Sequence, residues 1–169
     1  MNLNAHKVML LGEIGVGKSS IAQRLVFDRF EASYKPTIGV DVYRYDLQNS
    51  TGGKPIRLIL WDSDGNLGDA IFKHIYLKEA SAAIIIGDVT RAETINAMPQ
   101  IARSFRDRLP GRCVTFIVNK MDLARDEPSE LPEDLNKASM PLFRTSALSG
   151  DNVRQAFEAT AAAVVRAAR

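Results

Sequence analysis

Residues 12–19 constrain this chain more than any other segment, because their glycines and lysine occur at a spacing that suits one structural role. The sequence GEIGVGKS fits the pattern G-x-x-x-x-G-K-S, a turn between a strand and a helix whose backbone N–H groups converge on an anion. Glycine is needed in such a turn because side chains would block the approach of a phosphate. The first turn of the following helix adds unpaired N–H groups and the positive end of the helix dipole. The segment therefore predicts a phosphate-binding loop.

Side chains of this loop are expected to contact a nucleotide directly. Lys18 is predicted to reach the β- and γ-phosphates, and the Ser19 hydroxyl to take one position on Mg²⁺. The alternative, a glycine turn that only joins a strand to a helix, is less favoured. The other residues predicted to form the phosphate site are Gly15, Val16, Gly17 and Ser20.

The composition limits the classes of protein to which such a loop can belong. The 169 residues suit a single domain, residues 1–169, whose core needs no disulfide. The only cysteine, Cys113, lies in the apolar run CVTFIV and predicts a buried thiol in a reducing cytoplasm. A formal net charge of +2 without a long basic run argues against nucleic acid as a partner.

Apolar runs alternate with segments of helical periodicity along the chain. The predicted strands are residues 7–11, 40–47, 56–61, 82–89, 113–118 and 142–145. The predicted helices are residues 20–27, 94–109, 132–138 and 151–168, with an irregular helical segment before residue 79. Pro99 is compatible with a helix only in its first turn, and Asp151 or Asn152 is expected to cap the last helix.

This alternation predicts a mostly parallel sheet that is covered by helices on both faces, with ligand-binding loops at the carboxyl ends of its strands. The candidate functional residues all follow predicted strands. The phosphate loop follows the first strand, Asp62 the third, Asn119 the fifth and Ser146 the sixth. The topology alone is therefore expected to bring these residues together.

Asp62 ends an apolar strand, where a carboxylate can hold Mg²⁺ through a water molecule beside the phosphate loop. Gly65 follows closely and is expected to bring a backbone N–H to the terminal phosphate. The alternative for Asp62 is that of an ordinary turn residue.

The quartet NKMD predicts recognition of a guanine base. The carboxylate of Asp122 can accept hydrogen bonds from the ring N–H and the exocyclic amine of guanine, a pairing that adenine cannot offer. Asn119 is expected to add polar contacts, and the stem of Lys120 to lie along the base with its ammonium near solvent. Ser146 and Ala147 would extend the same wall, Ala147 through its N–H. A plain surface turn is the alternative.

Together these motifs resemble those of the Ras-superfamily small GTPases, and those of the Rab branch most of all. The resemblance covers essentially the whole chain through GEIGVGKSS, YKPTIGVDV, WDSDG, IIIGDVT, NKMD and TSAL. It implies the P-loop NTPase fold, an α/β three-layer sandwich with a six-stranded, mostly parallel sheet and one antiparallel edge strand. It also implies GTP and GDP as ligands with Mg²⁺, and switch segments that the γ-phosphate orders and hydrolysis releases.

The same resemblance implies roles for residues outside the first motif. Thr37 would ligate Mg²⁺ and touch the γ-phosphate, Phe30 would pack against the guanine edge, and Tyr34 would cover the phosphates. Effector proteins would bind through residues 31–42 and 62–79. An exchange factor and an activating protein are further expected partners.

The chain departs from the family pattern where hydrolysis takes place. The family has D-T-A-G-Q-E, but this chain has DSDGNL, so Asn66 replaces the glutamine that positions water. Asp64 is expected to repel the γ-phosphate, and the alternative is that it orients water itself. Hydrolysis is therefore predicted to be slow. The candidate catalytic residues are Lys18, Thr37, Asp64, Gly65 and Asn66.

Other departures bear on partners and on membranes. Ile14 stands where a small residue is usual and would crowd an inserted arginine, and Leu148 keeps apolar packing near the base but replaces a lysine. Apolar stretches such as residues 82–86 are far too short to span a membrane. The final residues given do not include the cysteine tail that is prenylated in Rab proteins, so either lipid anchoring is absent or the tail has been removed. We therefore expect a cytoplasmic monomer that does not insert into membranes.

The leading hypothesis is a guanine-nucleotide switch that hydrolyses GTP slowly. The first alternative is a GTP-bound binding module with negligible hydrolysis. A phosphate-loop kinase or ATPase is a weaker alternative, because NKMD has no role in such an enzyme.

Overall fold

The computed structural model describes residues 4–48, 54–63, 76–125, 131–136 and 140–168, and every structural statement below concerns these residues. The strands are β1 (Asn4–Leu11), β2 (Val40–Leu47), β3 (Ile56–Ser63), β4 (Ala82–Asp88), β5 (Cys113–Asn119) and β6 (Leu142–Arg144). The helices are α1 (Lys18–Phe27), α3 (Ala92–Asn96), α4 (Met98–Arg108), α5 (Glu133–Asn136) and α6 (Val153–Ala167), with a 3₁₀ turn η1 (Met121–Leu123).

The strands form one six-stranded sheet in the order β2-β3-β1-β4-β5-β6. Only β2 pairs antiparallel, with β3, and the other neighbouring strands run parallel. The expected mostly parallel sheet with an antiparallel edge strand is therefore confirmed. From β1 the chain continues toward the β2 and β3 side, whereas from β4 it continues toward β5. The connections leaving β1 and β4 thus diverge and leave a crevice at the carboxyl ends of these neighbouring strands, where open α/β sheets bind ligands.

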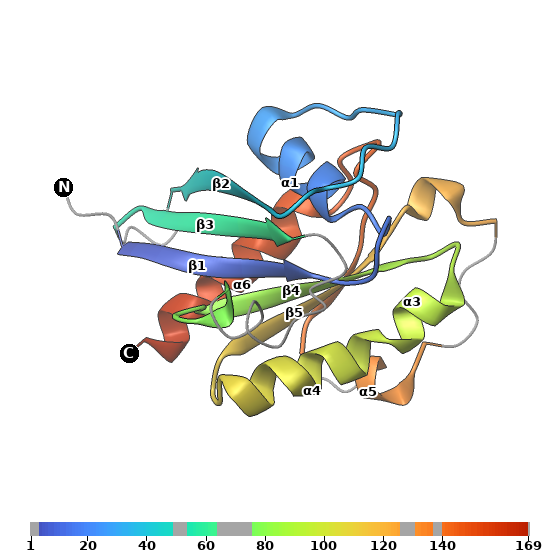
Figure 1. The fold of residues 1–169 in the computed structure, drawn as a ribbon. Coiled ribbons are helices and arrows are strands. Elements are labelled where there is room, and N and C mark those ends of the chain that lie inside the picture. Colours follow the sequence, from blue (N-terminus) through green and yellow to red (C-terminus); the bar gives the residue numbers. More distant parts are fainter. Residues whose placement is uncertain (1–3, 49–53, 64–75, 126–130, 137–139, 169) are drawn as a thin grey trace.

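Helices cover both faces of the sheet. Side chains of the central strands alternate in direction, so apolar residues on each face need a helix to bury them. In β1, Val8 and Leu10 pack in a core with α1 and α6, whereas Met9 packs in a second core with α4. Every residue of β4 is buried, as expected for a parallel strand that is covered on both faces. In Figure 1, α6 passes behind the strands. The protein is thus a three-layer α/β sandwich.

The predicted helix over residues 94–109 is wrong as a single element. The structure has α3 and α4 on either side of Ala97. Pro99 is the second residue of α4, in the first turn, where its missing N–H removes no helical hydrogen bond. In one continuous helix, Pro99 would have left a backbone hydrogen bond unmade because proline has no N–H. The second helix instead begins just before this proline, which then lies where that N–H is not needed.

The start of α6 also differs in its chemistry from the prediction. Asn152 precedes the helix as expected, but it has a left-handed φ of 56° and makes no side-chain cap. Its Nδ2 instead donates to the carbonyl of Arg144 at 2.9 Å, so the side chain ties the helix start to β6. Cys113 is half-buried rather than buried. The irregular helix expected before residue 79 falls mostly outside the described residues.

No helix in the described part of the chain is long and apolar enough to cross a lipid bilayer.

Candidate nucleotide-binding site

A cavity of about 400 Å³ lies at the carboxyl ends of the strands, within the size range of small-molecule sites. It is lined by most of the described residues that were predicted to bind nucleotide. These are Gly15, Gly17, Lys18, Ser19, Ser20, Phe30, Tyr34, Thr37, Asn119, Lys120, Asp122, Ala147 and Leu148. Val16 and Ser146 are buried and are not among the lining residues. The sheet therefore brings together segments that lie far apart in the sequence.

The phosphate loop joins β1 to α1, and its carbonyl oxygens are held by donors. Lys18 Nζ donates to the carbonyls of Gly12 and Glu13 at 3.0 and 2.9 Å. The carbonyls of Ile14, Gly15 and Val16 accept from Arg91, Lys120 and Asn119 at 2.7, 2.7 and 3.1 Å. In a trans peptide the N–H of the next residue points opposite to the carbonyl. The N–H groups of Gly15, Val16 and Gly17 therefore point away from these side chains.

Gly17 shows why the loop needs glycine at this point. Its φ is 102°, in the left-handed region that L side chains avoid. A Cβ built on Gly17 would collide with Nδ2 of Asn119. Asn119 can therefore reach the Val16 carbonyl only because residue 17 has no side chain.

Oxygen atoms from separate elements gather at the start of α1. The Ser19 hydroxyl donates to Oδ2 of Asp62 and lies 2.8 Å from Oγ1 of Thr37. Asp62 is fully buried, and its Oδ1 has no hydrogen-bond partner among the described residues. Hydroxyl and carboxylate oxygens are the ligands that Mg²⁺ prefers, so these residues fit a magnesium ion.

Burial dominates the electrostatics of Asp62. It raises the pKa of this carboxyl to about 6, against the opposing effects of the Ser19 hydrogen bond and the Lys18 charge. A cation beside Oδ1 would favour the ionised carboxylate. The free oxygen and the raised pKa thus describe a carboxylate whose burial is only partly offset by the Lys18 charge.

The base motif lines the same cavity and contacts the phosphate loop through Asn119 and Lys120. Asp122 is exposed, and its Oδ1 accepts from the Ser146 hydroxyl at 2.6 Å. Asn119 is buried, and its Oδ1 accepts from Thr145 Oγ1 and the Ala147 N–H at 3.0 and 3.3 Å. The amide of Asn119 thus joins the phosphate loop to the loop after β6. Its predicted contacts with the base stay a prediction.

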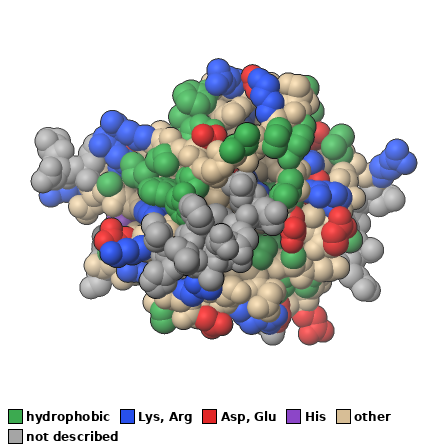
Figure 2. Space-filling model, viewed as in Figure 1, with side chains coloured by type: hydrophobic (Ala, Val, Ile, Leu, Met, Phe, Trp, Pro, Cys, Tyr) green, Lys and Arg blue, Asp and Glu red, His purple; other side chains and the backbone are tan. Residues whose placement is uncertain are grey.

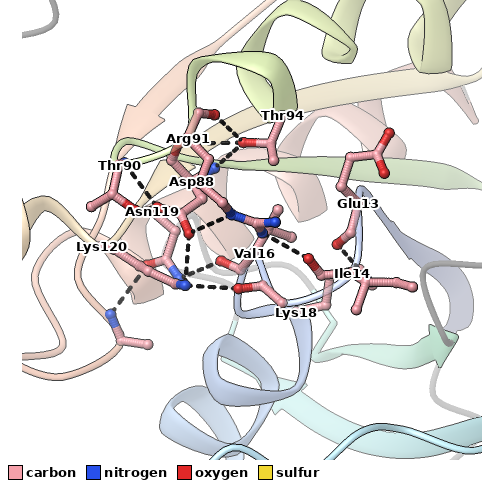
Figure 3. Close-up of polar contacts among 12 residues, drawn as sticks. Glu13, Ile14, Val16, Lys18, Asp88, Thr90, Arg91, Thr94, Asn119 and Lys120 are labelled. Atoms are coloured by element: carbon pink, nitrogen blue, oxygen red, sulfur yellow. Dashed lines mark hydrogen bonds and ion pairs between the residues drawn. The ribbon is translucent and has the colours of Figure 1, made fainter.

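The Lys120 side chain is partly exposed, and its ammonium has partners that the sequence did not predict. Its Nζ forms an ion pair with Oδ2 of Asp88 at 2.7 Å and donates to the Gly15 carbonyl (Figure 3). Burial alone would raise the pKa of Asp88, but hydrogen bonds from Lys120 and Thr90 outweigh it, and the pKa of this carboxyl falls below its ordinary value. Asp88 was not predicted as a site residue. The signal available for it was a charged residue at the end of an otherwise apolar strand.

Arg24 is a second residue that sequence patterns did not identify. It extends from α1 and donates through Nε to the Ala147 carbonyl at 2.8 Å and through Nη2 to the Leu148 carbonyl at 2.6 Å. It therefore ties the helix that follows the phosphate loop to the loop beside the base. An arginine on a surface helix carries no pattern that predicts such a contact.

Asp64, Gly65 and Asn66 lie outside the described residues, so their predicted roles stay predictions. Phe30 and Tyr34 line the cavity and are 37% and 66% exposed. Ile14 also lines it and is 49% exposed, and its predicted crowding of an inserted arginine stays a prediction.

The structure has a glycine-rich loop at the crevice of a mostly parallel sheet, as phosphate-loop nucleotide-binding proteins do. Beside this loop lies the buried Asp62 carboxylate, and the exposed Asp122 carboxylate lines the same cavity. The Ras family model matches residues 7–166. The chain therefore belongs to the Ras family, and its relatives place it in the Rab branch. It is a small GTPase, a GTP-binding switch protein.

Among these relatives, the Ras-related protein YPTC6 of Chlamydomonas reinhardtii is 31% identical over 156 residues, 90% of this chain and 71% of that protein. The Ras-related protein Rab-32A of Dictyostelium discoideum is 32% identical over 162 residues, 89% of this chain and 74% of its own. The Ras-related protein Rab11C of Lotus japonicus is 30% identical over 159 residues, which are 90% of this chain and 71% of that protein.

Proposed function

We propose that this protein is a guanine-nucleotide switch that binds GTP and GDP with Mg²⁺, hydrolyses GTP slowly and presents its switch segments to effector proteins. The observation that carries the proposal is one cavity with two chemically different ends. Residues of the phosphate loop, Ser19 and Thr37 line the proposed phosphate end, where Ser19 bonds to the buried Asp62, and Asp122 lines the proposed base end.

At the phosphate end, the buried ammonium of Lys18 supplies positive charge inside the loop. In the proposed complex it would exchange its bonds to the Gly12 and Glu13 carbonyls for the phosphates, which are stronger acceptors because they are charged. Ser19 and Thr37 would ligate Mg²⁺, and Asp62 would hold it through water. The ion would neutralise charge on the phosphates during transfer to water.

At the base end, Asp122 would accept both guanine donors. Its Oδ1 is oriented by Ser146, and Arg24 fixes the loop that carries Ala147. Lys120 would cover the base with its stem while Asp88 holds its ammonium. This arrangement favours guanine over adenine, because adenine offers no matching pair of donors.

The effector surface proposed for residues 31–42 carries apolar side chains in water. Tyr34, Ile38 and Val42 are 66%, 91% and 54% exposed. Figure 2 shows hydrophobic side chains between charged ones over α1 and the loop that follows it. Exposed apolar groups of this kind mark protein-binding sites. An exchange factor and an activating protein are further proposed partners, and residues 62–79 would complete the surface.

The alternative, a GTP-bound binding module with negligible hydrolysis, is favoured by one observation, the replacement of the water-positioning glutamine by Asn66. It shares the nucleotide site with the leading proposal and differs only in the fate of GTP.

Protein purified without added ligand is expected to carry guanine nucleotide, and EDTA is expected to release it because Mg²⁺ helps to hold the phosphates. Chromatography of the heat-released nucleotide identifies the base, and competition between GTP and ATP measures the preference. Bound adenine nucleotide would contradict the proposal. A time course of bound GTP separates the two candidates, since GDP accumulates in a switch but not in the module.

Thr37→Ala is expected to weaken binding of the GTP analogue GMPPNP with Mg²⁺ by about tenfold or more, while GDP affinity stays nearly unchanged. The reason is that Thr37 is proposed to join the ion to the γ-phosphate, which GDP lacks. Titration of each nucleotide by calorimetry measures the effect. Thr37→Ser keeps the hydroxyl and serves as the matched control. An equal loss for both nucleotides would count against the assignment.

A further inference from the structure

Arg91 holds the phosphate loop from outside the motifs that identify the nucleotide site. It precedes α3, directly after the β4 connection, at the crevice where β1 and β4 diverge. Its Nη2 donates to the carbonyl of Ile14 at 2.7 Å. Gly15 lies against the same guanidinium, because a Cβ built on Gly15 would be 3.5 Å from Nη2. The side chain is therefore packed on the outer side of the loop.

Asp88 determines where this guanidinium lies. The carboxylate is 1% exposed, and both of its oxygens are occupied. Oδ1 accepts from the N–H and hydroxyl of Thr90 at 2.9 and 2.7 Å. Oδ2 pairs with Lys120 at 2.7 Å and with Nε of Arg91 at 3.3 Å. One fixed carboxylate thus orients two cations, and each cation donates to a carbonyl of the phosphate loop, as Figure 3 shows.

The bond from Arg91 controls one peptide plane. The carbonyl of Ile14 and the N–H of Gly15 belong to the same planar unit and point in opposite directions. Gly15 has a φ of 77° and, as a glycine, loses more conformational freedom than other residues when it is fixed. A donor on the Ile14 carbonyl therefore holds the Gly15 N–H in the direction needed for an anion. Donors that are oriented before the ligand arrives bind it more tightly, because no ordering cost remains.

We propose that Arg91, oriented by Asp88, is a positioning residue that sets how long nucleotide phosphates remain bound to this protein. The inference rests on the proposed guanine-nucleotide function. Arg91 is proposed to act on the phosphate loop alone, without contacting the base. Lys120 differs, because it bonds to the phosphate loop and is also proposed to cover the base.

Arg91→Ala is expected to release GDP about tenfold faster than the parent, as the loss of one charge-assisted bond to the loop implies. Arg91→Lys is expected to release GDP at a rate between those of the parent and Arg91→Ala. A lysine keeps the charge but lacks the guanidinium group whose separate N–H donors reach Asp88 and Ile14 together. Asp88→Asn is expected to release GDP faster than Arg91→Ala, since it removes the carboxylate that orients both Arg91 and Lys120. Stopped-flow fluorescence with mant-GDP, chased by excess GDP, measures these rates.

The preference for GDP over IDP distinguishes positioning of the phosphate loop from a general loss of structure. IDP lacks the exocyclic amine of guanine, so the ratio of the two affinities reports on the base end. Arg91→Ala is expected to leave this ratio at the parent's value. The matched control is Arg103→Ala, which removes an exposed arginine of α4 that pairs with Asp134 outside the cavity. Its GDP release is expected to equal that of the parent.

GDP release from Arg91→Ala within twofold of the parent would overturn the inference, and so would a fall in the GDP over IDP preference as large as the change in release. If Arg91→Ala does not fold, Arg91→Met gives the same comparison, because it keeps an unbranched apolar chain and has no donor. A parent protein that carries no guanine nucleotide would overturn the proposed function together with the inference. A guanine-loaded parent whose release is insensitive to Arg91 would overturn the inference alone.

Discussion

Asp122→Asn is expected to lower the affinity for GTP by about 10⁴-fold and to raise the affinity for xanthosine triphosphate. The carboxylate is proposed to accept two donors of guanine, and an amide would place its own donor against one of them. A site built around such bonds rejects a mismatched partner strongly, because polar groups that the bound base would cover are left unpaired. Xanthine has a carbonyl in place of the amine, which suits an amide donor. The Ser146 hydroxyl, 2.6 Å from Oδ1, orients either side chain.

Displacement of fluorescent GDP by each triphosphate measures this exchange of specificity. Asp134→Asn is the matched control, because Asp134 is a partly exposed carboxylate that pairs with Arg103 and does not line the cavity. Its GTP affinity is expected to equal that of the parent. An Asp122→Asn protein with unaltered GTP affinity would show that the base lies elsewhere.

Asn66→Gln is expected to accelerate single-turnover GTP hydrolysis by about 10²-fold. Phosphoryl transfer depends on positioning and charge stabilisation, and the family's glutamine orients the attacking water. The side chain of Asn66 is shorter by one carbon–carbon bond of about 1.5 Å. Misplacement by about 1 Å costs roughly 10² in rate. Quenched-flow measurement of phosphate release tests the variant, and an unchanged GDP affinity shows that the nucleotide site is intact.

Asp64→Ala tests whether the Asp64 carboxylate repels the γ-phosphate or orients the attacking water. Repulsion between Asp64 and the γ-phosphate predicts faster hydrolysis in this variant, because like charges are costly where water is scarce. A fast parent that Asp64→Ala disables would show that Asp64 orients the water, and the argument from Asn66 would then be wrong. Ile14 is expected to reduce acceleration by any activating protein that inserts an arginine, since its side chain is 49% exposed at the cavity.

Local patterns in the sequence were sufficient for the fold and for most of the cavity. A strand that is buried on both faces is apolar along most of its length, so β4 and β5 were recognisable as apolar runs. The spacing of glycines and lysine in residues 12–19 predicts a phosphate loop because few backbone conformations allow N–H groups to converge. Since parallel strands end at one edge, Asp62 and Asn119 could be placed at a common site without knowing any distance.

Tertiary structure alone decided which partners the polar groups take. The sequence led us to expect the Lys120 ammonium near solvent, and only the pairing of β4 with β5 brings the Asp88 carboxylate to it. Arg24 and Arg91 look like ordinary surface arginines, since a sequence shows the type of a side chain but not what lies opposite it. The division of residues 94–109 into α3 and α4 followed from where Pro99 could lose its N–H without cost. Periodicity is local, whereas these contacts join residues that only the folded sheet brings within reach.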